Sequence, residues 1–189
     1  MSSAAVAFSG GLDTTCIIAW LKEVYGYDEV VAVLVDVGQE FDLEQSQERG
    51  YAAGADDVLL IDRREAFANV QCAKALKTNA LYEGKYPLIS ALSRPVIAGA
   101  VAELAQEIGA EAAVHGCTGK GNDQVRFELA FRANYPGVKV IAPLRDRWAV
   151  SVADGPDLEV QGNLLDYEYS IGEGRDKIAE VSKRWFRVA

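Results

Sequence analysis

The chain has 189 residues, enough for one substantial domain, and half of them are hydrophobic, so a buried core is expected. Its formal net charge of −9 argues against nonspecific nucleic-acid binding and against an anionic membrane surface. No apolar run is long enough to cross a bilayer, and the start Met-Ser-Ser-Ala-Ala lacks the charged and hydrophobic regions of a secretory signal. Three widely spaced cysteines without metal-ligand spacing are typical of a reducing compartment. We therefore expect a cytoplasmic protein with no membrane or nucleic-acid partner.

The first chemically distinctive stretch runs from Ala7 to Thr15 and joins an apolar strand to a helix. The apolar run stops at Ser9-Gly10-Gly11, and apolar residues with helical spacing follow almost at once. Such a turn leaves several backbone N–H groups pointing one way, and the helix dipole adds partial positive charge there. Because glycine has no Cβ, a ligand can approach the backbone closely. The stretch predicts an anion site, with a phosphate as the expected ligand.

The polar side chains of this stretch leave more than one interpretation open. Ser9, Thr14 and Thr15 add hydroxyl donors. Asp13 would repel a phosphate, so it fits either a helix cap or a carboxylate near a ligand-bound magnesium ion. The alternative to a phosphate site is an ordinary strand-to-helix turn capped by Asp13 or Thr14. The motif is neither a Walker loop nor Gly-x-Gly-x-x-Gly, but Ser-Gly-Gly-Leu-Asp-Thr resembles the pyrophosphate loop of the N-type ATP pyrophosphatases.

Strand and helix patterns alternate along residues 1–148. After the first strand, short and mostly β-branched apolar runs predict four more, at Glu29–Gly38, Val58–Asp62, Ala112–Gly116 and Val138–Ala142. Helical patterns fill the intervals at Leu43–Ala53, at Arg64–Leu76 and from Ser93, as a cap with Pro95 in the first turn, to Ile108. This alternation predicts an α/β domain with a doubly wound, mainly parallel five-stranded sheet.

A second polar loop follows the fourth strand, from Gly116 to Glu128. Arg126 could hold a carboxylate through a two-pronged hydrogen bond, and Asp123 could bind an amino group. The alternative is a solvated connection with a helix cap at Asn122 or Asp123. Because both polar loops follow parallel strands, we expect them at the same edge of the sheet, where one could hold a triphosphate and the other an acceptor.

The remaining candidates for chemistry are single residues. His115 is the only histidine, and a packed or capping role is favoured over general base catalysis. Cys16, Cys72 and Cys117 are interpreted as core filler rather than nucleophiles, and Trp20 as packed against the sheet.

The end of the chain has a different pattern. Residues 149–157 read as a polar linker that contains glycine and proline. In residues 158–189, two alternating segments flank Gly172–Asp176, which predicts a β-hairpin. This tail is weakly similar to a hairpin of the LURP-one-related, tubby-like family.

With both loops read, residues 5 to about 147 resemble the nucleotide-binding domain of the argininosuccinate synthase family. The matching segments are Ala7–Thr15, Val35–Gln39, Asn79–Leu88, Ala91–Pro95 and His115–Glu128. The resemblance implies an ATP-dependent ligase of arginine biosynthesis that condenses citrulline with aspartate and releases AMP and pyrophosphate, with Mg²⁺ neutralising the phosphates. It also implies a homo-oligomer. Family members are much longer than this chain, so an ATP-binding module without catalytic turnover is the alternative.

The resemblance also assigns binding residues, without any protein group acting as a catalytic acid or base and without a metal site made by protein alone. ATP would contact Ala7, Phe8, Ser9, Gly10, Gly11, Leu12, Asp13, Thr14 and Thr15, with Val35 and Gly116 also against the nucleotide. Aspartate would contact Thr118, Asn122 and Asp123, and citrulline would contact Tyr86, Ser90, Asn122 and Arg126.

Two other ATP-binding classes fit less well. A tRNA thiolase needs a catalytic cysteine and a basic RNA surface, whereas this chain is acidic and has no suitable cysteine motif. A universal-stress-type fold has its glycine loop late in the chain rather than at the start.

Overall fold

The computed structural model describes residues 2–40, 42–119 and 121–146. In these residues, five parallel strands form one sheet in the order β3-β2-β1-β6-β7. The strands are β1 (Ser3–Ala7), β2 (Glu29–Asp36), β3 (Asp57–Asp62), β6 (Ala112–Val114) and β7 (Lys139–Ile141). The predicted five-stranded, doubly wound parallel sheet is therefore confirmed.

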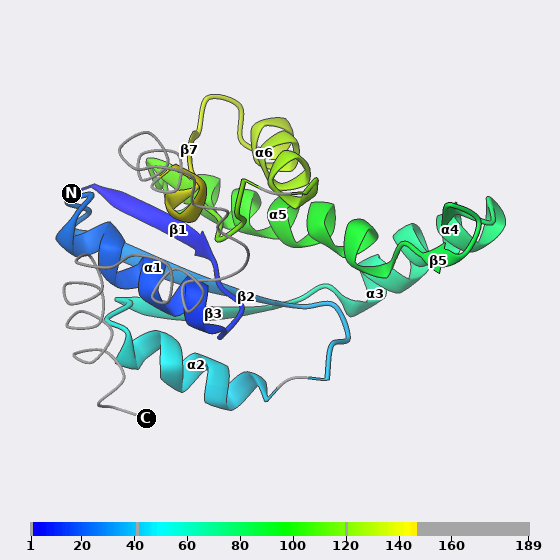
Figure 1. Cartoon of the computed structure of the whole chain (residues 1–189). Helices are drawn as coiled ribbons and strands as arrows, with labels where there is room; N and C mark the ends of the chain where they lie inside the picture. Colours follow the sequence, from blue (N-terminus) through cyan, green and yellow to red (C-terminus); the bar gives the residue numbers. More distant parts are fainter. Residues whose placement is uncertain (1, 41, 120, 147–189) are drawn as a thin grey trace, which may run out of the picture.

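Helices cover both faces of the sheet (Figure 1). On one face lie α1 (Leu12–Glu23) and α2 (Leu43–Ala52), and on the other lie α5 (Ile89–Glu107) and α6 (Asp123–Asn134). The sheet has one hydrophobic core on each face, and the side chains of each strand point alternately into the two cores. Val6 therefore shares a core with Ile17, whereas Ala5 shares the other core with Phe131. Burial on both faces explains why the central strands read as continuous apolar runs.

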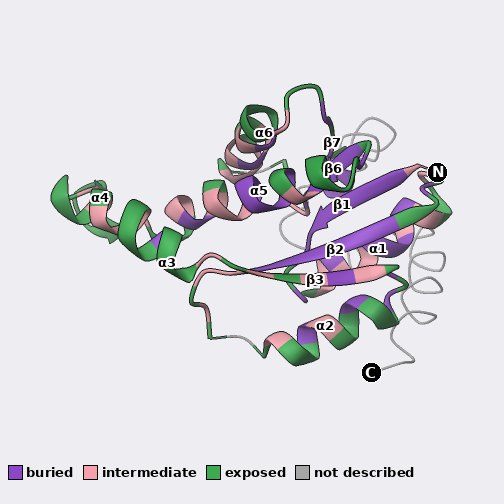
Figure 2. Cartoon of the chain, turned by 180° about the vertical axis from the view of Figure 1, so that it is seen from behind, coloured by how far each residue is buried: buried purple, intermediate pink, exposed green. Residues whose placement is uncertain are grey.

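Residues 64–88 form an arm that extends away from the sheet in both views (Figures 1 and 2). The arm consists of α3 (Arg64–Ala66), the π-helical turn η1 (Phe67–Cys72), α4 (Ala73–Lys77) and a hairpin of β4 (Leu81–Tyr82) and β5 (Tyr86–Pro87). The predicted helix at 64–76 is thus confirmed, with a π-helical turn inside it. The hairpin was not predicted, because its two strands are only two residues long.

Two predicted helix starts are wrong. The N-cap of α1 is Gly11, so Asp13 lies inside the first turn and neither Asp13 nor Thr14 caps the helix. Helix α5 starts at Ile89, four residues before the predicted cap Ser93, which leaves Pro95 in the helix interior. A proline usually marks a helix start, but here the helix continues on both sides of it and lacks one backbone hydrogen bond.

The predicted linker 149–157 and hairpin 158–189 lie outside the described residues. Within the part of the chain that the structure covers, no helix is long and apolar enough to span a membrane.

Candidate functional site

The glycine turn after β1 is held by hydroxyl groups of its own stretch. The Ser9 and Thr14 hydroxyl oxygens are 3.1 Å apart, and the Ser9 N–H donates to Thr14 Oγ1 at 3.3 Å. Thr15 Oγ1 donates to the Gly11 carbonyl at 2.8 Å. Ser9 and Gly11 are exposed at the surface. Since the N-cap Gly11 has no side chain, no cap accepts from the first amides of α1, which suits an anion there.

Helix α2 packs against this turn and hydrogen-bonds to it. Gly10 has a φ of +74°, and a Cβ on it would lie 2.5 Å from the hydroxyl oxygen of buried Ser46. Arg49, one turn further along α2, donates from Nη1 to the Gly10 carbonyl at 3.2 Å. Gly10 is therefore required both by its left-handed backbone and by the close approach of α2.

The second polar loop meets the first, because it leaves the strand next to β1. Val6 in β1 pairs with Val114 in β6, and both strands run in the same direction. A Cβ on Gly116 would lie 3.0 Å from Thr14 Cγ2 and 3.3 Å from Ile17 Cδ1. The backbone of the second loop thus packs against the first turn of α1, and the expected shared edge is confirmed.

His115 anchors the second loop from inside the core. It is fully buried, and its Nδ1 accepts from the Cys117 N–H at 3.2 Å. Its ring centroid lies 5.5 Å from that of Phe127 and 6.1 Å from that of Phe131. Burial lowers the pKa of His115 to about 4. A buried, neutral histidine that holds a backbone amide has a packing role, as the sequence suggested.

The three cysteines are half-buried rather than true core residues. Burial raises the pKa of Cys117 to about 11, so this residue remains a thiol at neutral pH. Cys117 is thus unsuited to act as a nucleophile, which argues against thiolase-type chemistry at this loop. Trp20 is partly buried against the core that α1 covers, consistent with the expected packing.

Two candidate substrate residues in the first turn of α6 bind each other, and one of them also binds an arginine of α5. Asp123 Oδ2 accepts from Arg94 Nε at 3.0 Å, and Asp123 Oδ1 accepts from Arg126 Nη1 at 2.8 Å. Ser90 precedes Arg94 by four residues, so both lie on one face of α5 about one helical turn apart. The structure therefore brings Asp123 and Arg126 together beside Arg94, with Ser90 one turn before Arg94 in α5.

The rest of the second loop is exposed or half-buried. Thr118 is half-buried and Asn122 is exposed. Asn122 is the N-cap residue of α6, but its side chain makes no capping hydrogen bond. Lys120 lies outside the described residues, and the neighbouring Gln124 side chain donates to the Gly119 carbonyl at 2.9 Å.

Tyr86 is not brought to this region. It lies in β5, in the hairpin at the far end of the arm, and its side chain is 61% exposed (Figure 1). Its predicted contact with a substrate beside Arg126 remains a prediction.

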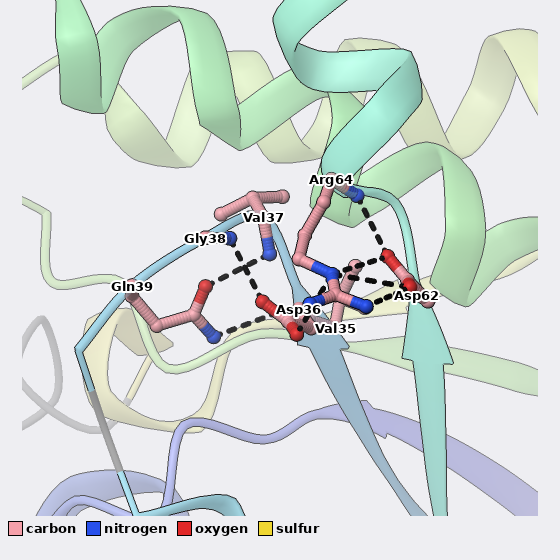
Figure 3. Close-up of polar contacts among 7 residues, drawn as sticks. All are labelled: Val35, Asp36, Val37, Gly38, Gln39, Asp62 and Arg64. Carbon is pink, nitrogen blue, oxygen red and sulfur yellow. Dashed lines mark hydrogen bonds and ion pairs between the residues drawn. The ribbon is translucent and has the colours of Figure 1, made fainter.

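At the neighbouring strand ends, Arg64 joins two carboxylates (Figure 3). Arg64 Nη2 lies 2.6 Å from Asp62 Oδ2, and Nε lies 3.4 Å from Asp36 Oδ2. The hydrogen bond from Arg64 lowers the pKa of Asp62 to about 2. Beside this cluster is an open hollow of about 770 Å³ lined by residues 62–66, Asn69 and Val70. Because Arg64 pairs with a carboxylate at the end of each of two strands, the cluster fastens the arm to the sheet.

Among the described residues, no group of three or more histidine, cysteine or acidic side chains is placed to hold a metal ion. Asp13 is the acidic residue of the first turn of α1, next to the exposed glycine turn. A magnesium ion here would therefore need phosphate oxygens as its main ligands, with Asp13 within the same turn.

Sequence reasoning missed the residues that support the site from other elements. Ser46 and Arg49 belong to the predicted helix at Leu43–Ala53, to which no part in the site was assigned, and Arg94 was interpreted only as part of a helix start. A glycine in a tight turn is a local signal for a left-handed backbone, but nothing in the sequence shows which helix packs against Gly10.

The sheet order, the exposed glycine turn at the end of β1 and the second loop at the end of β6 define the class of protein. It is a doubly wound α/β domain with its candidate ligand crevice outside the carboxyl ends of adjacent parallel strands.

A family model described as the arginosuccinate synthase N-terminal HUP domain matches residues 3–154. The chain belongs to this family. Among curated relatives, the argininosuccinate synthase of Saccharolobus solfataricus is 56% identical over 140 residues, which cover 74% of this chain and 36% of that protein. The argininosuccinate synthase of Brevibacillus brevis is 45% identical over 173 residues, or 89% of this chain and 41% of that protein.

The argininosuccinate synthase of Pyrobaculum aerophilum is 43% identical over 186 residues, or 98% of this chain and 45% of that protein. This alignment includes residues after 148, which the sequence analysis treated as a separate linker and hairpin. The chain spans less than half the length of these three relatives.

A solved structure confirms the fold type alone. The chain is similar to a predicted subunit of tRNA methyltransferase from Methanocaldococcus jannaschii, with a TM-score of 0.50 and 14% identity. The similarity covers 82% of this chain and 76% of that one.

Proposed function

We propose that this chain provides the ATP-binding half of an argininosuccinate synthase-type ligase. In that reaction, the ureido oxygen of citrulline is adenylylated by ATP with release of pyrophosphate, and the amine of aspartate then displaces AMP. The observation that carries the proposal is the contact between the two loops. The family match and the named relatives support it.

Each loop would contribute a different half of the site. The turn at Ser9–Gly11, in which Ser9 and Gly11 are exposed, and the first amides of α1 suit the phosphates of ATP, and Gly116 lies where the two loops meet. Mg²⁺ would supply charge neutralisation on the phosphates, with Asp13 as the nearest acidic residue of the turn.

The amino-acid substrates would lie between α5 and α6. Arg126 offers a guanidinium that can hold a carboxylate, and Asp123 offers a carboxylate that can hold an amino group. In the described structure these two side chains bind each other, and Asp123 also binds Arg94, so they are already oriented. Thr118 and Asn122 stand in the same loop, and Ser90 lies one turn from Arg94. Alignment and charge neutralisation would do most of the catalytic work.

The binding half of the proposal can be tested by calorimetry with Mg-ATP. Gly11 has a φ of −80°, so Gly11→Val is compatible with the backbone but adds bulk beside Ser9 Oγ, which lies 3.3 Å from a Cβ there. We expect this variant to lose ATP binding. Ala52→Val, at an exposed position at the other end of α2, should bind ATP normally. Absence of heat with the unchanged chain, or equal affinity in both variants, would contradict the proposal.

The alternative is an ATP-binding module without turnover. This alternative is motivated by the length of the chain, which spans less than half of the three relatives. A pyrophosphate-release assay separates the two functions. Release that requires both citrulline and aspartate would support the ligase, whereas ATP binding without release would support the module. We also propose a cytoplasmic location and a homo-oligomer, which fractionation and sedimentation can test.

A further inference from the structure

The end of β2 presents backbone groups toward the space beyond the end of β1. The Phe8 N–H donates to the Val33 carbonyl at 3.0 Å, so the backbone groups of Val33 face β1. Backbone groups alternate in direction along a strand, so the Val35 carbonyl faces the same side. The last residue of β1 is Ala7, paired with Val33, and the chain then turns into Ser9–Gly11. The Val35 carbonyl therefore faces the side of the glycine turn and has no strand partner there among the residues that the structure describes.

A side chain takes the place of that missing strand. Gln39 Nε2 donates to the Val35 carbonyl at 3.0 Å, and the Val37 N–H donates to Gln39 Oε1 at 2.8 Å (Figure 3). One carboxamide thus satisfies a backbone acceptor and a backbone donor at the same time. Gln39 is half-buried in this position.

The donor and acceptor of a carboxamide have the same arrangement as one edge of adenine. A carboxamide places an N–H donor and an oxygen acceptor on one carbon, and adenine places its N6 amino group beside the N1 acceptor in the same way. The Val35 carbonyl and the Val37 N–H are therefore complementary to adenine as well as to Gln39. We propose that Gln39 mimics the adenine edge and competes with the base of ATP for these two backbone groups.

The surroundings allow Gln39 to leave. The residue before it, Gly38, has a φ of +93°, and apart from its two chain neighbours no atom of the described residues lies within 4 Å of the position of a Cβ. The turn itself is fixed independently, because the Gly38 N–H donates to Asp36 Oδ1 at 2.8 Å and Asp36 pairs with Arg64. When adenine binds, two hydrogen bonds to Gln39 are exchanged for two to the base, and the carboxamide moves into water. This inference rests on the proposed function, since it concerns the base of ATP.

The test compares Gln39→Ala with the unchanged chain by calorimetry, with Mg-ATP and with inorganic tripolyphosphate as a probe that lacks a base. Removing the competitor should tighten ATP binding by about fivefold, the effect of roughly one hydrogen bond, and leave tripolyphosphate binding unchanged. Gln47→Ala is the matched control, because the Gln47 carboxamide binds the Val58 carbonyl on the side of α2 and should affect neither ligand. Weaker or equal ATP binding in Gln39→Ala would overturn the proposal.

A second readout follows the side chain directly. In nuclear magnetic resonance spectra, the Gln39 side-chain NH₂ signals are assigned by their absence in Gln39→Ala. ATP should make these protons exchange rapidly with water, while tripolyphosphate should leave them protected. Protection that persists with ATP would overturn the proposal. If the unchanged chain binds tripolyphosphate but not ATP, or binds neither, the proposed function fails instead.

Discussion

At the scale of single residues, the glycine turn depends on the absence of one carbon atom. Gly10 has a φ of +74° and faces the buried Ser46 hydroxyl, whereas Gly26 has nearly the same φ, +73°. Apart from the chain neighbours of Gly26, no described atom lies within 4 Å of a Cβ placed on it. The two glycines therefore separate the cost of a left-handed backbone from the cost of crowding.

We expect Gly10→Ala to lower the free energy of unfolding by about 2 to 4 kcal/mol, because backbone strain and overpacking add. Gly26→Ala should lower the free energy of unfolding by about 1 to 2 kcal/mol, because it adds backbone strain without overpacking. Urea denaturation of both variants measures the difference, and adding Ser46→Gly to Gly10→Ala should recover part of it. Equal losses in the two single variants would show that α2 does not crowd the turn.

His115 also acts as a single residue, through its protonation state. Its folded pKa of about 4 lies below the ordinary value of 6.5, so the unfolded chain binds more protons in this window. The contribution of neutral His115 to the free energy of unfolding is therefore fully present above pH 6.5 and is lost as the pH falls toward 4.

This shift predicts that the unchanged chain loses on the order of 2 kcal/mol between pH 7.5 and pH 5 through His115 alone. His115→Gln, which keeps an acceptor for the Cys117 N–H, should lack this part of the pH dependence. The free energies of unfolding of the two proteins, measured by urea denaturation at pH 7.5, 6 and 5, should converge as the pH falls. Parallel pH profiles would show that His115 does not titrate as described.

At the scale of elements, α5 links the sheet to the substrate side of the site. Its second half carries small buried residues, among them Ala98, Ala102 and Ala105, which let it lie close to the sheet. Its first half carries Arg94, which binds Asp123 of α6, and Ser90 lies about one turn before it. Pro95 stands between the two halves and cannot donate a hydrogen bond to the Ala91 carbonyl.

Because Pro95 is exposed, its replacement removes little packing. Pro95→Ala should therefore raise the free energy of unfolding by about 1 to 3 kcal/mol through the restored helical hydrogen bond. Gln106→Ala, at an exposed position of the same helix, is the control and should change stability by less than about 0.5 kcal/mol. A loss of stability in Pro95→Ala would show that the proline is needed for the packing of α5.

At the scale of the whole molecule, the site exists only where two distant segments meet. Thr14 and Gly116 are far apart in the chain, yet a Cβ on Gly116 would lie 3.0 Å from Thr14 Cγ2. A ligand that contacts both loops should stabilise the entire fold, because it binds the folded state and not the unfolded chain.

Mg-ATP at about 100 times its dissociation constant should raise the free energy of unfolding by roughly 2.7 kcal/mol. Gly116→Val should abolish this gain by separating the loops. Gly119→Val is the control in the same loop, since a Cβ there meets Arg145 Cγ at an ordinary 3.5 Å. Thermal or urea unfolding with and without Mg-ATP measures both variants, and an undiminished gain in Gly116→Val would contradict the proposed site.

The local properties of the chain were readable in advance. Alternating apolar strands and helices predicted the parallel sheet, because backbone pairing and burial on both faces leave a strong pattern. The two polar loops were found for a similar reason, since glycines and clustered polar residues at strand ends interrupt that pattern. The starts of α1 and α5 were mispredicted, because Asp13 and Pro95 tolerate positions inside a first turn or a helix as well as at its boundary.

Contacts between elements were decided only by the tertiary structure. Ser46 against Gly10 and Arg94 on Asp123 are pairings over 36 and 29 positions of the chain, and local sequence preferences carry no information about such distances. The hydrogen bonds between the Gln39 side chain and the backbone of Val35 and Val37 are local in the chain. They form because β1 ends before β2 does, which leaves these backbone groups without a strand partner among the described residues. The amino-acid sequence thus determined which strands and loops form, whereas packing determined which side chains from other elements hold the loops in place.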